Sequence, residues 1–194
     1  MVNLLANRTY AIGAAILLAV IAIFGLHANE LDAGYAKPFL IFLHVLSGTT
    51  WIGLLYYFNL VQIPTMPKIP AELKGGVSKY IAPEALLWFR WGAIATLVTG
   101  IGVAEADPAR YLVPALTFQS PYKVIGIGMW LATIMAANVW MIIWPNQQRA
   151  LGLVPADDAS KAKSGRVAML ASRTNFVLSF PMFYCMVTQM YLPR

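Results

Sequence analysis

The sequence predicts an all-α integral membrane protein that folds as a bundle of about five transmembrane helices. Of its 194 residues, 59% are hydrophobic and only 11% are charged, whereas a soluble domain carries about 25% charged residues. The mean hydropathy is +0.65. The apolar residues gather into runs of about 20, the length that a helix needs to cross the hydrocarbon core of a bilayer.

These apolar runs divide the chain into predicted helices at residues 10–27, 39–63, 86–104, 122–144 and 167–192. The first run could be a signal peptide, because Arg8 precedes it, but it is long for one and we expect it to remain as a helix. Pro38 opens the second helix, which is expected to end near Pro64, and Pro67 and Pro70 prevent its continuation. We predict a single transmembrane domain over residues 1–194.

Polar connections separate the predicted helices. The connection at residues 65–84 contains the pair Gly75 and Gly76, which disfavours a stable helix. The fourth helix is expected to end at Pro145, and a polar loop at residues 146–165 follows it.

The basic residues predict the orientation of the bundle. The side that holds the N-terminus carries Arg8, Lys68, Lys74, Lys79, Arg149, Lys161, Lys163 and Arg166. The opposite side carries only Lys37, Arg110, Lys123 and Arg194. The positive-inside rule then predicts a cytoplasmic N-terminus and a periplasmic C-terminus in a bacterial inner (cytoplasmic) membrane. The net charge of +6 therefore indicates contact with membrane lipid and not with nucleic acid.

His44 lies within the second apolar run, which carries no charged residue. A titratable side chain in hydrocarbon costs free energy unless something satisfies it, so it is a candidate functional residue. Gly48 and Trp51 follow it, and small residues let a flat cofactor approach the backbone. We interpret His44 as an axial ligand of haem b. The alternative is a structural histidine that is hydrogen-bonded to a neighbouring helix.

Three other residues are candidate second ligands on the same predicted side of the membrane. His27 ends the first helix, and Met186 and Met190 lie near the end of the last one. Histidine and methionine both serve as axial haem ligands. The alternatives are that His27 is an interfacial residue in water and that the methionines serve helix packing.

Cys185 is the single cysteine, so an internal disulfide and a multi-cysteine zinc site are excluded. With Met182 and Met186 it could form a soft copper(I) site, and copper handling is therefore one alternative function. The sequence shows no Ser-His-Asp set and no phosphate-binding glycine loop.

A group of polar residues falls in the predicted cytoplasmic half of the membrane: Asn59, Arg90, Asn138, Arg173 and Asn175. We predict a buried polar cluster whose arginines bind a lipid phosphate, a polar group of haem or quinone, or the asparagine carbonyls. The alternative is that the arginines extend to the headgroups. No carboxylate lies within the apolar runs, so the acidic relay of a proton pump is missing.

Four blocks of sequence resemble the membrane domain of PuuD-type urate hydroxylases, the urate oxidase N-terminal membrane domain family. They read HVLSGTTWIGLLYYFNLVQIP, WFRWGAIATLVTG, NVWMIIWPNQQ and SRTNFVLSFPMFYCM, in that order from His44 to Met186. A looser similarity, a histidine followed by Trp-x-Gly, extends to copper-resistance membrane proteins and to haem-containing membrane protoporphyrinogen oxidases.

The resemblance implies a membrane domain that is associated with electron transfer. In the family a cytochrome c domain follows the membrane domain, but this chain has no CxxCH motif, so a cytochrome c would be a separate periplasmic partner. The matching positions are His44 with Trp51 and Gly53, Asn138 with Trp144 and Pro145, and Arg173 with Asn175 and Pro181.

The sequence therefore predicts a membrane-embedded b-type haem or electron-transfer subunit. It would work with a periplasmic cytochrome c or within a larger respiratory or redox membrane complex. The alternatives are a non-catalytic accessory subunit of such a complex, a component of urate or purine oxidation, and copper handling.

Overall fold

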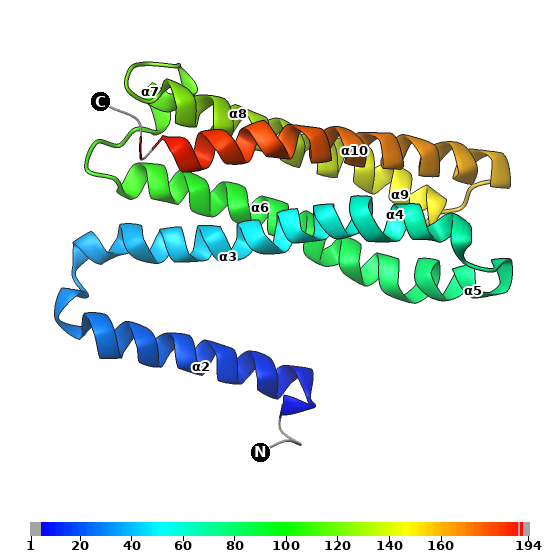
Figure 1. Ribbon diagram of the computed structural model, residues 1–194, viewed down its shortest axis with the longest axis horizontal. Coiled ribbons are helices and arrows are strands. Elements are labelled where there is room, and N and C mark those ends of the chain that lie inside the picture. The colour runs from blue at the N-terminus through cyan, green and yellow to red at the C-terminus, as the bar shows by residue number, and fades with distance from the viewer. Residues whose placement is uncertain (1–4, 190, 192–194) are drawn as a thin grey trace. The chain divides into compact units, whose positions relative to one another are not determined.

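The computed structural model describes residues 5–189 and residue 191, and these residues form helices joined by turns and short loops (Figure 1). The described residues contain no strand, so the prediction of an all-α protein is confirmed for them. Met190, one of the candidate ligands, lies outside the described residues. The chain forms two compact units, Met1–Phe39 and Leu40–Arg194.

The first unit consists mainly of α2 (Arg8–His27). The side chain of Asn7 caps this helix by accepting a hydrogen bond from the backbone N–H of Thr9 at 2.9 Å. Two short 3₁₀ turns follow at Ala28–Glu30 and Ala33–Tyr35. No residue of α2 is buried within the structure, and an apolar helix with this exposure suits contact with lipid or with another protein.

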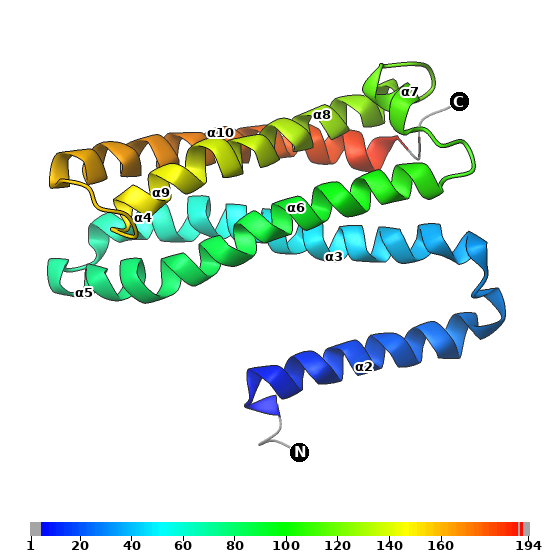
Figure 2. The ribbon, with the colours of Figure 1, turned by 180° about the vertical axis from the view of Figure 1, so that it is seen from behind.

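The second unit contains the other long helices (Figures 1 and 2). α3 begins at the end of the first unit and continues into the second. The helical segments in chain order are α3 (Ala36–Tyr56), η3 (Tyr57–Gln62), α4 (Ile63–Thr65), η4 (Met66–Lys68), α5 (Ala71–Gly76), η5 (Val77–Ile81), α6 (Ala82–Ala106), α7 (Leu112–Leu116), α8 (Lys123–Asn138), η6 (Val139–Ile143), α9 (Trp144–Ala150) and α10 (Asp158–Thr188).

The segments η3, η5 and η6 are π-helical, and a proline follows each of them within two residues. The widened turn is visible at Ile63, whose N–H bonds to the carbonyl of Phe58, five positions earlier. A proline lacks an N–H and its ring clashes with the carbonyl four residues before it, so a wider turn at this point relieves the conflict. The helices therefore continue through Pro64 and Pro145, and the prediction that they end there is wrong.

Among the described residues, four helices are long and apolar enough to cross a membrane: Arg8–Glu30, Ala36–Lys68, Ala71–Ala106 and Lys123–Ala150. They support a multi-pass membrane protein, with one such helix fewer than the five predicted. The predicted fifth span falls on α10, which is a helix of 31 residues but is not among the four. Its hydropathy is lowered by polar residues such as Ser172, Asn175 and Ser179, and these three are buried inside the protein.

Two predicted loops are also shorter than expected. Residues 71–81 form α5 and η5 in spite of Gly75 and Gly76, so most of the predicted 65–84 loop is helical. α9 extends to Ala150 and α10 begins at Asp158, which leaves only a short connection between them. Gly152, in this connection, has a φ of +71°, a conformation that glycine adopts without strain.

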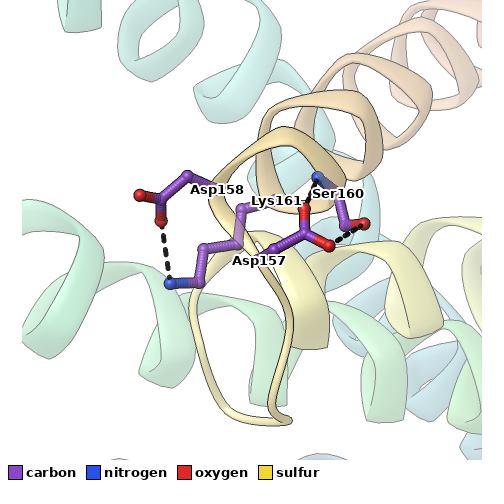
Figure 3. A network of polar contacts seen from close by, with 4 residues as sticks. All are labelled: Asp157, Asp158, Ser160 and Lys161. Atoms are coloured by element: carbon purple, nitrogen blue, oxygen red, sulfur yellow. Dashed lines mark hydrogen bonds and ion pairs between the residues drawn. The ribbon is translucent and has the colours of Figure 1, made fainter.

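Polar side chains fix the start of α10 (Figure 3). The Asp157 carboxylate accepts a hydrogen bond from the backbone N–H of Ser160 at 2.7 Å, and the Ser160 hydroxyl lies 3.2 Å from its other oxygen. Lys161 pairs with Asp158 at 3.3 Å. Hydrogen bonds from backbone N–H groups stabilise the charged carboxylate, and the pKa of Asp157 is lowered from its ordinary value.

The core of the second unit lies where α3, α6, α8 and η6 meet. Trp51, Leu55, Phe89, Met135 and Val139 are almost completely buried there. α10 runs alongside α8 and α9 in both views of the ribbon (Figures 1 and 2). This arrangement places the polar residues of α10 against α8, where they form the contacts described below.

Candidate functional site

His44 lies on α3 and contacts α6. Its Nδ1 atom lies 2.9 Å from the carbonyl oxygen of Thr96 and 3.2 Å from the Thr99 hydroxyl oxygen. A carbonyl oxygen can only accept a hydrogen bond, so Nδ1 must be the donor and carries the proton. In the neutral ring the lone pair is then on Nε2, which has no hydrogen-bond partner among the described residues. Metal-binding histidines commonly take this form, with one nitrogen held by an oxygen acceptor.

Small residues allow α3 and α6 to approach each other at His44. A Cβ added to Gly100 would lie only 3.0 Å from Cε1 and 3.3 Å from Nδ1 of the imidazole. A Cβ added to Gly48 would lie 3.8 Å from the methyl group of Thr96. His44 therefore faces Gly100 while Gly48 faces Thr96, which is an antiparallel register. The absence of a side chain at Gly100 gives the half-buried imidazole its place against α6.

Trp51 lies at the next contact between α3 and α6 in this register, toward the core. It is 0% exposed, and a Cβ added to Gly92 would lie 3.3 Å from its backbone nitrogen. The indole Nε1 is buried without a hydrogen-bond partner. Trp51 therefore packs in the core between helices, and its position is that of a structural residue two turns from His44.

Within the second unit, the described residues place no other candidate ligand beside His44. His27 belongs to the first unit, where its Nδ1 pairs with Glu30 at 2.8 Å and its ring lies 5.5 Å from that of Tyr35. Met186 packs against α8, since a Cβ added to Gly128 would lie 3.4 Å from its methyl carbon.

The candidate copper residues pack between α8 and α10. Cys185 and Met182 are buried, and a Cβ on Gly128 would lie 3.1 Å from the Cβ of Cys185. The described residues contain no group of three or more His, Cys, Asp or Glu side chains that could hold a metal ion. These contacts are those of ordinary helix packing.

Two asparagines of the predicted polar cluster, Asn138 and Asn175, contact each other between α8 and α10. Asn138 donates hydrogen bonds to the carbonyl of Ala171 at 2.9 Å and to the Asn175 side chain at 2.7 Å. Asn175, which is 0% exposed, donates to the carbonyl of Met135 at 2.9 Å. We call this pair of side chains the asparagine network. It joins α8 to α10 through both side chain and backbone.

Asn59 also contacts α10, at a different residue from those of the asparagine network. Its Nδ2 donates to the hydroxyl of Ser172 and to the carbonyl of Leu55, each at 2.9 Å. One turn earlier, the Tyr56 hydroxyl lies 3.1 Å from that of Ser179. These contacts tie η3 and the end of α3 to α10. The structure shows no hydrogen bond that joins Asn59 to Asn138 or Asn175 among the described residues.

The two arginines of the predicted cluster differ. The guanidinium of Arg90 lies over the ring of Trp144 at 3.8 Å, and its Nη1 is buried without a partner. Arg173 is exposed. Neither arginine forms a hydrogen bond with the three asparagines in the part of the chain that is described, so the cluster does not hold together as one site.

A cavity of about 240 Å³ lies beside these residues. η3 contributes Phe58 and Gln62 to its lining, and α10 contributes Ala168 and Ser172. His44 does not line it. The cavity therefore does not belong to the candidate ligand position at His44.

Sequence reasoning missed the partners of His44 on α6. The signal was present, because Gly92, Thr96 and Gly100 recur at intervals of four and so form one face of a helix. Such a face of small residues predicts a close helix contact in a membrane protein. It does not by itself show which helix is the partner, and only the structure pairs it with His44.

The comparisons with known proteins bear on the C-terminal part of the chain. The family model for the urate oxidase N-terminal region matches residues 109–193, which is somewhat less than half of the chain. No curated protein and no solved structure shows significant similarity. The family match covers α7 to α10 and does not include His44. Over residues 109–193 the chain is therefore similar to the urate oxidase N-terminal family, and the resemblance seen in the sequence is confirmed for that part.

Proposed function

We propose that this chain is a urate-hydroxylase-related membrane component that binds haem b through His44 and takes part in electron transfer. One observation carries the proposal. His44 donates from Nδ1 to the backbone carbonyl of Thr96 at 2.9 Å, and this leaves Nε2 as an unused lone pair in an apolar part of the chain. A ring nitrogen that the described residues leave unused within a membrane span is a candidate site for a ligand from outside the chain.

The residues of the chain have defined roles in this proposal. The Thr96 carbonyl fixes the tautomer and the rotation of the imidazole, and Gly100 leaves the space that the ring occupies. Such an acceptor also raises the basicity of the ligating nitrogen. Haem, when bound, supplies the one-electron redox change, while the protein supplies the ligand and a low-dielectric setting.

Of the candidate residues that are described, His44 alone would hold the haem. His27 is engaged with Glu30, and Met186 with α8. Any second ligand would come from elsewhere, and we include a periplasmic cytochrome c or a larger membrane complex as electron partner. The charge asymmetry of the sequence supports a bacterial inner membrane with a cytoplasmic N-terminus.

The test is an optical spectrum of the full chain purified in detergent from cells supplied with haem. The wild type should show the bands of a reduced b-type haem, His44→Gly should lose them, and His27→Ala should keep them. Added imidazole should restore part of the signal to His44→Gly, because it replaces the missing ring. A folded wild type without haem would refute the proposal and leave an accessory subunit of a larger complex.

The family match favours a second, more specific candidate, a component of urate or purine oxidation. Membranes that contain the chain should then reduce added cytochrome c when urate is supplied, and membranes that lack it should not. Equal rates in both would remove this candidate without affecting the haem test.

A further inference from the structure

Arg90 is held in one position by tryptophans. Its guanidinium carbon lies 3.8 Å from the ring centroid of Trp144, a cation–π contact. The indole N–H of Trp140 donates to the Arg90 carbonyl at 3.1 Å, and the rings of Trp91 and Trp140 meet edge-on at 5.5 Å. Because α9 and η6 both hold this residue of α6, the guanidinium is oriented before any ligand arrives.

The positive charge of Arg90 has no counter-charge in the described part of the chain. Arg90 takes part in none of the ion pairs seen there, which include His27 with Glu30, Arg110 with Glu105, and Lys161 with Asp158. The Arg90 guanidinium forms no hydrogen bond with the described residues, and its Nη1 is buried without a partner. A half-buried charge that is unpaired costs free energy, so an anion from outside the chain would stabilise it.

The surroundings indicate the depth of Arg90 in the membrane. Trp88 and Trp91 are exposed on α6 to 52% and 56%, and tryptophans are enriched where headgroups meet hydrocarbon. Farther back along the same continuous helix is Lys79, and Arg149 lies past Trp144 at the end of α9. Basic residues at this level attract anionic lipid.

We propose that Arg90, oriented by Trp144, binds the phosphate group of an anionic membrane lipid. A guanidinium presents several N–H donors in a plane and matches two oxygens of a phosphate. Trp144 covers one face of the guanidinium, and the N–H groups of Arg90 would donate to the lipid phosphate. Arg173, although nearby in the predicted topology, is exposed and has no such aromatic support among the described contacts.

The test measures the thermal unfolding midpoint of delipidated full-length protein in detergent. Added phosphatidylglycerol should raise the midpoint of the wild type, and phosphatidylcholine and inorganic phosphate should raise it much less. Arg90→Gln should lose more than half of the phosphatidylglycerol shift. Arg173→Gln, the matched control, should keep it.

Two further variants guard against a failure to fold. Arg90→Lys retains the charge but not the planar donor set, and Trp144→Leu retains Arg90 without its aromatic support; each should show a reduced shift. Equal shifts in Arg90 and Arg173 variants would overturn the proposal, because the effect would then be diffuse surface charge. An equal response to inorganic phosphate or to phosphatidylcholine would also overturn it. None of these readouts depends on haem.

Discussion

The asparagine network and the His44 position both bury polar groups between helices, but they use them differently. In the network every amide nitrogen donates to another helix: Asn138 to Ala171 and Asn175, and Asn175 to Met135. At His44 one ring nitrogen donates across to α6, and the other has no partner among the described residues. The side-chain N–H donors of the network have acceptors within the chain, whereas Nε2 of His44 retains an unused lone pair.

This difference predicts that the asparagine network serves the stability of the fold and that His44 serves ligand binding. Hydrogen bonds that join two helices of one chain hold those helices together, and nothing else is needed to satisfy the donors. A ring that is held from one side and unused on the other is suited to bind something that the chain itself does not supply. Changes in the asparagine network should therefore alter folding, and changes around His44 should alter the bound group.

The largest effect on stability is expected from Asn175→Ala. The change removes the donor to Met135 and the acceptor for Asn138, and it leaves buried polar groups without partners. The loss should be about 1–3 kcal/mol in the free energy of unfolding. It is measured by denaturant titration of the protein in detergent.

Thr174→Ala is the matched control for this change. Thr174 is exposed on the same helix, and its hydroxyl bonds only to the Leu170 carbonyl of that helix. It should unfold like the wild type. If Asn175→Ala instead kept its stability and lost haem, the division between the two regions would be wrong.

The next effect is expected from Gly100→Ala. The new methyl group would lie 3.0 Å from Cε1 of His44, so the ring must move away from α6 and weaken its bond to Thr96. Loss of such a supporting contact typically costs about 10–100-fold in affinity for the bound group. The measurement is haem content per protein during titration with haem, with the unfolding curve as a check on folding.

Gly53→Ala is the control for the glycine change. A Cβ at Gly53 meets nothing within 4 Å, and alanine favours helix over glycine. Haem content should stay at the level of the wild type. Equal losses in both variants would show that helix α3 as a whole, and not the placement of the imidazole, controls binding.

A smaller effect is expected from Thr99→Val. The Thr99 hydroxyl lies 3.2 Å from His44 Nδ1, but it already donates to the Ala95 carbonyl at 2.6 Å, and Thr96 is the closer acceptor for the ring. Removing it should lower haem affinity by less than about 10-fold and shift the absorption bands slightly. A complete loss of haem would mean that Thr99, and not the Thr96 carbonyl, determines the tautomer.

The helices could be predicted from the sequence because a long apolar run leaves the chain few alternatives in a membrane. Their ends could not. Prolines were expected to end helices at Pro64 and Pro145, whereas a π turn before each one lets the helix continue. Whether a helix breaks or widens at a proline depends on packing against its neighbours, and a single sequence does not contain that packing.

The candidate site was predictable only in part, for a similar reason. His44 stands out because a titratable residue in an apolar run is unusual. Its acceptor is a backbone carbonyl, which every residue has, so no side-chain pattern identifies Thr96. The residues of the predicted polar cluster do not form one site, because a shared depth in the membrane does not determine which side chains meet. Arg90 and Arg173 share a predicted depth in the membrane, but helix rotation places one on Trp144 and leaves the other exposed.

The smallest effect concerns Asp157, an exposed polar contact outside both regions. Its lowered pKa comes first from the hydrogen bond with the Ser160 backbone N–H. The folded-state pKa is below the unfolded one, so the carboxylate stabilises the fold fully above the unfolded pKa and loses this effect as pH falls through the folded pKa. Wild type should therefore exceed Asp157→Ala in thermal midpoint near neutral pH, with the difference declining between about pH 5 and pH 3.

Asp157→Asn and Asp158→Asn complete this comparison. Asparagine at 157 keeps an acceptor for the Ser160 N–H but has no proton to gain, so its difference from Asp157→Ala should not change over the same pH interval. Asp158→Asn removes only the exposed pair with Lys161, and such pairs contribute little. Asp157→Ala should lower the stability of the protein less than Asn175→Ala does. The reverse order would mean that the exposed start of α10 contributes more stability than the buried asparagine network, and it would contradict the role of the network in joining α8 to α10.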